Sequence, residues 1–284
     1  MRRGHRTNRM RRLFKTAAVY IVLASVTVAM LFPVAWMLST SLKTEPETFR
    51  MPPTWVPLEP TISPYLNMWR MKNFARYFFN TAVVSIAATA LSLLLSVPAS
   101  YGFARFKFRG AQGMLSFILL TQMLPSVILI IPYFTLMRTL GILNTHLALV
   151  LAYASFSLPF CTWMLRGFFA GIPKEIDEAA MVDGCSRLMA MVRVVVPLAV
   201  PGIGATCLFT FLLAWNHYLF SLALSLNENM YTISVGLGAM MGEFRIAWNE
   251  MMAAALIATL PTILVYVFLE QYFVQGLTGG AVKG

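Results

Sequence analysis

Side chains that could catalyse a reaction or bind a metal are scattered through this sequence. The three histidines, His5, His146 and His217, lie in separate places without catalytic partners nearby in the chain, whereas hydrolases and transferases need such groups clustered. The segment GLTGGAVKG is not a phosphate-binding loop, because Ala281 stands where the second glycine belongs and no Ser or Thr follows Lys283. The sequence therefore favours neither an enzyme nor an ATP-hydrolysing chain.

The cysteines give no sign of a metal site either. They lack the spacing of metal ligands and fall in or near apolar runs or in a loop that we place in the cytoplasm below; they are Cys161, Cys185 and Cys207. We expect no metal and no disulfide.

Acidic residues, in contrast, concentrate in one stretch. Of eleven Asp and Glu, four lie between residues 175 and 183: Glu175, Asp177, Glu178 and Asp183. Pro173 suits a first helical position, and acids in the first turns are favoured by the helix dipole by about 0.3–1 kcal/mol each. Gly184 predicts a left-handed helix end, and Ser186 can cap a second helix that runs to Pro197. The stretch predicts two short helices hinged at a glycine.

The remaining sequence is too apolar for a soluble domain. Hydrophobic residues make up 58% and charged residues 12%, against about 45–50% and 25% in soluble proteins. Several apolar runs are long enough to cross a hydrocarbon layer of about 30 Å. They lack the alternation of barrel strands and must satisfy their own backbone in lipid. We predict an all-α membrane protein with six transmembrane helices, over residues 14–40, 79–103, 113–137, 146–168, 197–223 and 251–274.

The basic residues indicate the orientation of these helices. Fifteen of the 22 Lys and Arg lie near the termini, between the second and third helices, or in and beside the loop 171–196. The positive-inside rule then places both termini in the cytoplasm, with residues 1–13 and 275–284 as tails and 41–78 as an external loop. The net charge of +11 therefore reflects the orientation of the chain in the lipid bilayer, and we expect no nucleic-acid partner.

The predicted helices lack ionisable groups but contain prolines. No Asp, Glu, Lys or Arg lies in the middle of any of them, which opposes a proton- or sodium-coupled transporter and places the energy source elsewhere. Prolines could kink all six helices around a cavity, although proline is also simply commoner in membrane helices. They are Pro33, Pro98, Pro125 with Pro132, Pro159, Pro201 and Pro261.

The acidic stretch resembles the EAA loop of permease subunits of bacterial ATP-binding-cassette (ABC) importers. Glu178-Ala179-Ala180, then Gly184 and Pro197, match the pattern E-A-A-x3-G-x9-I-x-L-P, with Val194 and Val196 in place of its Ile and Leu. The segments AWNHYLFSLAL, YTISVGL and QGLTGGAVKG are similar to the smaller, six-span permease of carbohydrate importers, of the maltose and oligosaccharide type. The similarity covers most of the chain from Phe79 onward, but His217 stands where family members often carry an acid, which leaves its role open.

The resemblance implies the type I ABC importer permease fold, with residues 79–274 as its core and 171–196 as cytoplasmic coupling helices. It implies half of a sugar translocation pathway in a bacterial or archaeal cytoplasmic membrane. The expected partners are a second permease in a heterodimer, two ATPase subunits and an extracytoplasmic solute-binding protein. This chain would bind no cofactor, because ATP and Mg belong to the ATPase. A permease for a related solute such as glycerol phosphate and, more distantly, a secondary transporter are the alternatives.

The resemblance also implies three groups of site residues. The ATPase-coupling group is Glu178, Ala179, Ala180, Asp183, Gly184, Val194, Val196 and Pro197. The loop that would contact the binding protein contains Tyr231, Gly236, Gly238 and Phe244. Aromatic rings and amides that suit a hydroxylated ligand are Gln122, Tyr153, Trp215, Asn216 and Tyr218. For Trp215 and Tyr218 we favour a role as anchors at the membrane interface.

Overall fold

The computed structural model describes residues 2–71, 73–241 and 246–281, with side chains described for 14–70, 73–241 and 246–272. These residues form helices joined by loops, and their only β-type pairing is an isolated bridge between Met241 and Ile246. The chain divides into two compact units, residues 1–72 with 241–256 and residues 73–240 with 257–284. The helical fold class predicted from the sequence is confirmed.

The first unit begins with a long apolar helix. Helix α1 (Arg2–Ser41) contains a 28-residue stretch, Phe14–Ser41, that is apolar enough to span a membrane. The proline-rich segment after it forms only the short helices α2 (Glu45–Thr48) and α3 (Ser63–Met71), because proline interrupts helices.

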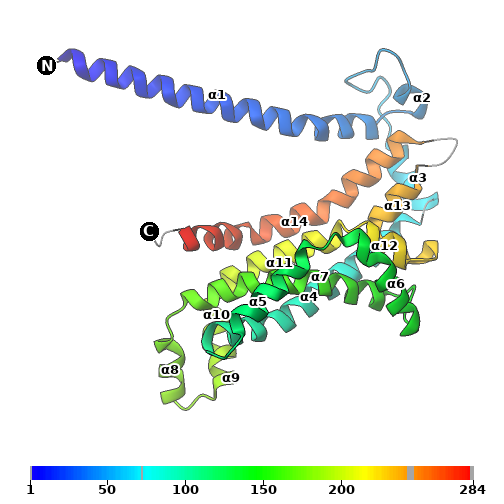
Figure 1. Ribbon diagram of the computed structural model, residues 1–284. Helices are drawn as coiled ribbons and strands as arrows, with labels where there is room; N and C mark the ends of the chain where they lie inside the picture. Colours follow the sequence, from blue (N-terminus) through cyan, green and yellow to red (C-terminus); the bar gives the residue numbers. More distant parts are fainter. Residues whose placement is uncertain (1, 72, 242–245, 282–284) are drawn as a thin grey trace. The chain divides into compact units, whose positions relative to one another are not determined.

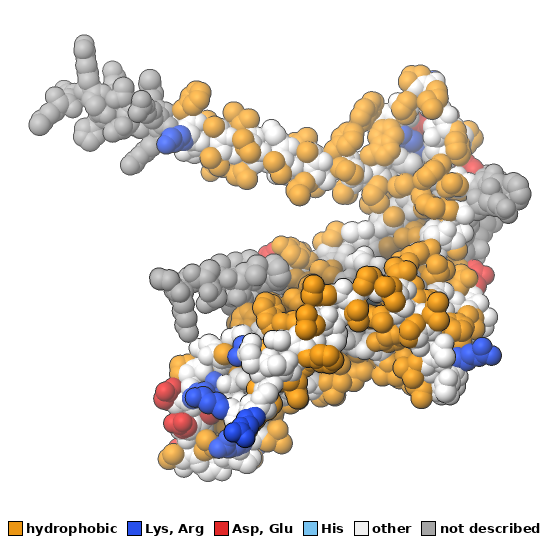
Figure 2. All heavy atoms as spheres, viewed as in Figure 1, with side chains coloured by type: hydrophobic (Ala, Val, Ile, Leu, Met, Phe, Trp, Pro, Cys, Tyr) orange, Lys and Arg blue, Asp and Glu red, His pale blue; other side chains and the backbone are white. Residues whose placement is uncertain are grey.

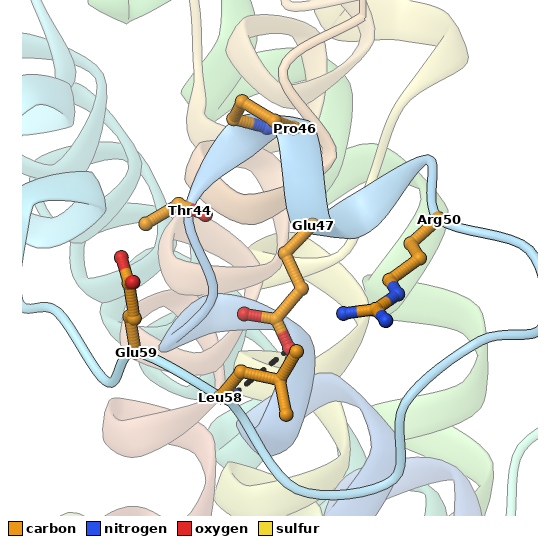
Figure 3. A pocket seen from close by; sticks show the side chains of 6 residues that line it. All are labelled: Thr44, Pro46, Glu47, Arg50, Leu58 and Glu59. Atoms are coloured by element: carbon orange, nitrogen blue, oxygen red, sulfur yellow. Dashed lines mark hydrogen bonds between the residues drawn. The ribbon is translucent and has the colours of Figure 1, made fainter.

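A polar pocket of about 390 Å³ lies in the loop around α2 (Figure 3). Its lining residues are Thr44, Pro46, Glu47, Arg50, Leu58 and Glu59. The Glu47 carboxylate accepts hydrogen bonds from Thr54 Oγ1 at 2.7 Å and from Leu58 N at 3.0 Å. The bond from Thr54 is the main cause that lowers the pKa of Glu47. None of the residues predicted to act in transport lies here.

The second unit is built around two long helices, α4 (Phe74–Arg105) and α7 (His146–Gly171), with α11 (Val200–Trp215) against both. A buried row of small side chains on α4, at Ser85, Ala88, Ser92, Ser96 and Ser100, allows α7 to approach closely. Ser100 Oγ donates to Thr162 O of α7 at 3.0 Å. Helices α4 and α7 together form the frame against which the other elements of the unit pack.

Two of the six predicted transmembrane helices are not continuous. The run 113–137 breaks after α5 (Ala111–Leu120) and the turn η1 (Thr121–Met123); η2 (Ser126–Leu129) and α6 (Ile130–Thr139) continue at an angle of 92°. Pro125 lies at this break and has no N–H to continue the helix. Among the described residues, four continuous helices are long and apolar enough to span a membrane, and the number rises to six if each of two bent pairs is one span. This agrees with the predicted number of spans.

The other interrupted run is 197–223. It bends by 78° at Ala199, between α10 (Val196–Leu198) and α11, and is interrupted again at residues 216–218 before α12 (Leu219–Leu224). The long helix within this predicted span therefore begins at Val200. Pro201 lies in the first turn of α11, where it costs no hydrogen bond and produces no kink. The sixth span lies in α14 (Trp248–Ala281).

Candidate functional site

The acidic loop, which we define as residues 171–196, forms the predicted pair of short helices. Helix α8 (Glu175–Val182) ends two residues before Gly184, whose φ of +88° is left-handed. Helix α9 (Arg187–Ala190) is capped by Ser186, which accepts a bond from Met189 N. A π-helical turn, η3 (Met191–Val195), follows. Figure 1 shows α8 and α9 together at one end of the second unit.

One acid of this loop is buried and tied to α4. Tyr101 Oη donates to Asp177 Oδ1 at 2.6 Å, and Arg105 Nη2 forms an ion pair with Asp177 Oδ2 at 2.8 Å. The side chains of Arg105 and Asp177 are 6% and 9% exposed. The sequence does not reveal this pair, because Asp177 fits the pattern of acids in a first helical turn and Arg105 fits the pattern of basic topology charges.

The predicted coupling group is only partly exposed. Glu178, Ala179, Asp183 and Gly184 are exposed, whereas Ala180 is buried within this chain at 7%. Ala180, three residues after Asp177, therefore packs against its own chain and offers little surface to a partner. Among the later members, Pro197 is exposed and two are half-buried, Val194 and Val196. In Figure 2 charged side chains gather at this end of the unit, while the flank beside it is mainly apolar.

The opposite end of the second unit holds the segment 225–233 and α13 (Ile233–Ala239). Side chains of α4 fasten the segment: Asn80 Nδ2 donates to Asn229 O at 2.8 Å and to Tyr231 O at 3.0 Å. Tyr77 Oη donates to Glu228 Oε1 at 2.5 Å. This bond and a second from Asn73 lower the pKa of Glu228. The segment is thus held in one conformation.

The predicted binding-protein contacts lie in or near this segment. Tyr231 is half-buried, and Gly236 is buried against the ring of Tyr77. Gly238 lies beside Tyr218, and Phe244 lies outside the described residues. Gly236 therefore positions α13 on α4 rather than offering a surface of its own.

Three residues with possible sugar-binding chemistry come together around Phe156. Gln122 Nε2, at the break between α5 and α6, donates to Phe156 O at 2.7 Å. The His217 ring, at the break between α11 and α12, stacks on Tyr153 at 4.8 Å and lies 6.2 Å from the Phe156 ring. Nδ1 of His217 is buried and has no hydrogen-bond partner among the described residues. His217 thus belongs to an aromatic cluster at two helix breaks.

The side chains of Trp215, Asn216 and Tyr218 lie outside this aromatic cluster. Trp215 is 3% exposed, and its Nε1 donates to Ala258 O at 3.1 Å. The interface-anchor interpretation is wrong for this ring, because an anchor must reach the membrane interface. The ring helps to line an apolar groove of about 620 Å³ between α4, α11 and residues 261–269 of α14. Asn216 is exposed and donates to Leu212 O, and Tyr218 is 41% exposed.

Comparisons with known proteins agree with this geometry. Residues 93–279 match the family described as binding-protein-dependent transport system inner membrane component. The chain is 39% identical over 254 residues to the sulfoquinovosyl glycerol transport system permease protein SmoH of Agrobacterium fabrum, with 89% of each chain covered. It is 34% identical to the diacetylchitobiose uptake system permease protein DasC of Streptomyces coelicolor, over 90% of this chain and 93% of that one.

A third relative and a solved structure extend the comparison. The trehalose/maltose transport system permease protein MalG of Thermococcus litoralis is 32% identical, over 89% of this chain and 92% of MalG. Among solved structures, a chain of a bacterial ABC transporter involved in the import of the acidic polysaccharide alginate has a TM-score of 0.81 at 22% identity. The match covers 93% of this chain and 98% of that one. The helical arrangement described above is therefore the fold of that chain.

Proposed function

The chain belongs to the family of binding-protein-dependent transport system inner membrane components, and from this membership we propose that it forms half of the pathway of an ATP-driven sugar importer. The observation that carries the proposal is the acidic loop, which exposes Glu178, Ala179 and Asp183 on and directly after α8, a short helix fixed to α4 through Asp177. A surface of this kind serves a docked partner. The names of SmoH, DasC and MalG, which refer to a sugar glycerol, a chitobiose and trehalose/maltose, favour a carbohydrate cargo.

The acidic loop is the proposed docking surface for an ATPase subunit. Exposed acids lie beside exposed apolar side chains there, with Val182 87% and Leu188 68% exposed. A second permease would supply the other half of the pathway, with one ATPase on each, and ATP and Mg would bind to the ATPases. This places the acidic loop and both termini in the cytoplasm, as the distribution of basic residues predicts.

The opposite end of the second unit then faces the solute-binding protein. The fastened segment 225–233 and α13 offer a preorganised surface, which lowers the entropic cost of docking. Sugar would pass the cluster of Gln122, Tyr153 and His217, since discontinuous helices line the substrate sites of many transporters.

Glu178→Lys tests the proposal. The side chain is exposed, so the variant is expected to insert normally and to lose most of its ATPase association, measured by co-purification and by sugar-stimulated ATP hydrolysis. Glu59→Lys is the matched control, because it reverses another exposed acid outside the acidic loop. Association and stimulated hydrolysis at the level of this control would refute the proposed function.

A further inference from the structure

We infer that the end of α4 is the lever that carries movement of the acidic loop into the membrane bundle, with Arg105 and Asp177 as positioning residues for energy coupling. The inference rests on the proposed function, because it assigns the route by which a docked ATPase would act. Its first support is the geometry of Arg105, the last residue of α4.

The Arg105 guanidinium joins three elements at one buried point. Nη2 pairs with Asp177 of α8, while Nη1 donates to Phe169 O, in the last turn of α7, and to Ile172 O, just after α7, at 2.9 Å each. A planar guanidinium suits several acceptors held in fixed directions, which a lysine ammonium does not reproduce. The end of α4 is thereby locked to both the exit of α7 and the start of the acidic loop.

The second helix of the acidic loop is held from the same place. The Arg187 guanidinium of α9 lies 5.4 Å from the ring centroid of Phe106, which directly follows α4. Tyr101, one turn before Arg105, adds its hydrogen bond to Asp177 and packs edge-on against Phe169 at 6.0 Å. The last turns of α4 thus contact α7 and α8, and the residue that follows α4 contacts α9.

Two connections of the acidic loop contain points at which the backbone departs from a regular helix. Toward α11 the chain passes through the π-helical turn Met191–Val195 and a bend of 78° at Ala199; π-helical turns are rare and usually mark functional sites. Between α8 and α9 it passes through the left-handed Gly184. A buried ion pair, in contrast, resists separation because each separated charge would lack compensation. A force on α8 therefore moves α4 before it deforms the pair.

Helix α4 also reaches the opposite end of the unit. It has 32 residues, which is roughly 48 Å at 1.5 Å per residue. Its first turns hold the segment 225–233 through Tyr77, Asn80 and Thr81. One helix is thus fixed to the proposed ATPase surface at one end and to the proposed binding-protein surface at the other, which makes it the most direct mechanical route between them.

The test uses the complete importer, with both permeases, the ATPases and the solute-binding protein, reconstituted in liposomes. Transported sugar and hydrolysed ATP are measured in the same sample. For Asp177→Asn and Arg105→Lys we expect the ATPases to stay bound and the transport per ATP to fall about tenfold, within the range typical of coupling between two sites. Asp177→Glu, which keeps the carboxylate, is expected to restore part of the ratio. The matched controls Glu59→Gln and Arg109→Lys change exposed side chains outside the acidic loop and are expected to leave it unchanged.

A purely structural role gives a different result. If the pair were purely structural, the variants would form less assembled complex, and transport and ATP hydrolysis would fall together. The sugar transported per ATP would then stay unchanged, and that outcome overturns the inference. Arg105→Lys and Tyr101→Phe keep both charges of the ion pair. Their ratio of transported sugar to hydrolysed ATP therefore tests the inference even if Asp177→Asn does not assemble. If Glu178→Lys loses the ATPases while Arg105→Lys keeps a normal ratio, the lever is refuted and the proposed function stands. If Glu178→Lys keeps them, the proposed function itself fails.

Discussion

Replacing Gly236 by alanine is expected to loosen the attachment of α13 to α4. A Cβ atom at this position would lie 2.2 Å from Cδ2 of Tyr77, 2.6 Å from Cε2 and 2.9 Å from Cγ. The ring has little freedom to yield, because Tyr77 is 4% exposed and its hydroxyl donates to Glu228. The substitution must therefore displace α13, or displace the ring and weaken its hydrogen bond.

The size of the effect follows from two opposing contributions. Overpacking a well-filled core costs about 1–3 kcal/mol. Alanine in place of glycine inside a helix returns roughly 0.5–1 kcal/mol. We expect a net loss of about 1–2 kcal/mol of unfolding free energy, with any loss of the Tyr77–Glu228 bond in addition. Such a loss lowers the unfolding midpoint by several degrees.

Gly238→Ala is the matched control, because it lies on the same helix. Its Cβ would lie 3.3 Å from Cε2 and the hydroxyl of Tyr218, a ring that is 41% exposed and free to shift. Thermal unfolding of the purified assembled permease compares the two variants. A midpoint for Gly236→Ala equal to or above that of Gly238→Ala would refute the packing argument. A double variant with Tyr77→Ala should lose less stability than the sum of the two changes, because the clash disappears with the ring.

Three further substitutions test the acidic loop, the segment 225–233 and a helix cap. Gly184→Ala has open space for its Cβ but must adopt a φ of +88°, so it is expected to cost about 1–2 kcal/mol in thermal unfolding, and Gly184→Asn less. Tyr77→Phe is expected to raise the pKa of Glu228 toward its ordinary 4.5. The hydrogen bond in the wild type stabilises the fold above pH 4.5, and this stabilisation is lost as the pH falls through the lowered pKa. The variant should therefore be less stable than the wild type at neutral pH and equally stable in acid. Thr145→Ala removes the cap of α7, an acceptor 3.3 Å from Ala148 N, and is expected to cost about 1 kcal/mol, measured in the same unfolding assay.

The membrane class and the acidic loop were accessible from the sequence because both are local signals. A long apolar run consists of consecutive residues, so it indicates a spanning helix without information from the rest of the chain. The two-helix loop depends on Pro173, Gly184 and Ser186, each of which acts on its own turn of the chain. Hydropathy does not register the breaks at residues 124–125 and 216–218, because apolar residues continue on both sides of them.

The buried ion pair was not accessible, because its partners are far apart in the chain. Asp177 lies 72 positions after Arg105 and 76 positions after Tyr101, and several acids and bases of the same types lie nearby in the sequence. Only the packing of α4 beside α7 selects Arg105 and Asp177 from them. The burial of Trp215 could not be predicted for a similar reason, because its hydrogen-bond partner Ala258 lies 43 residues further along the chain.

The positions of these long-range contacts separate rigid from deformable parts of the second unit. The frame of α4 and α7 is continuous and closely packed, and its two ends are fixed by Arg105 and by Tyr77. The helices that carry Gln122 and His217 are broken where those residues lie. Because a break removes backbone hydrogen bonds that would resist bending, a displacement of α4 is accommodated there first. The same breaks that hydropathy overlooks therefore place the most deformable backbone beside the residues proposed to meet the sugar.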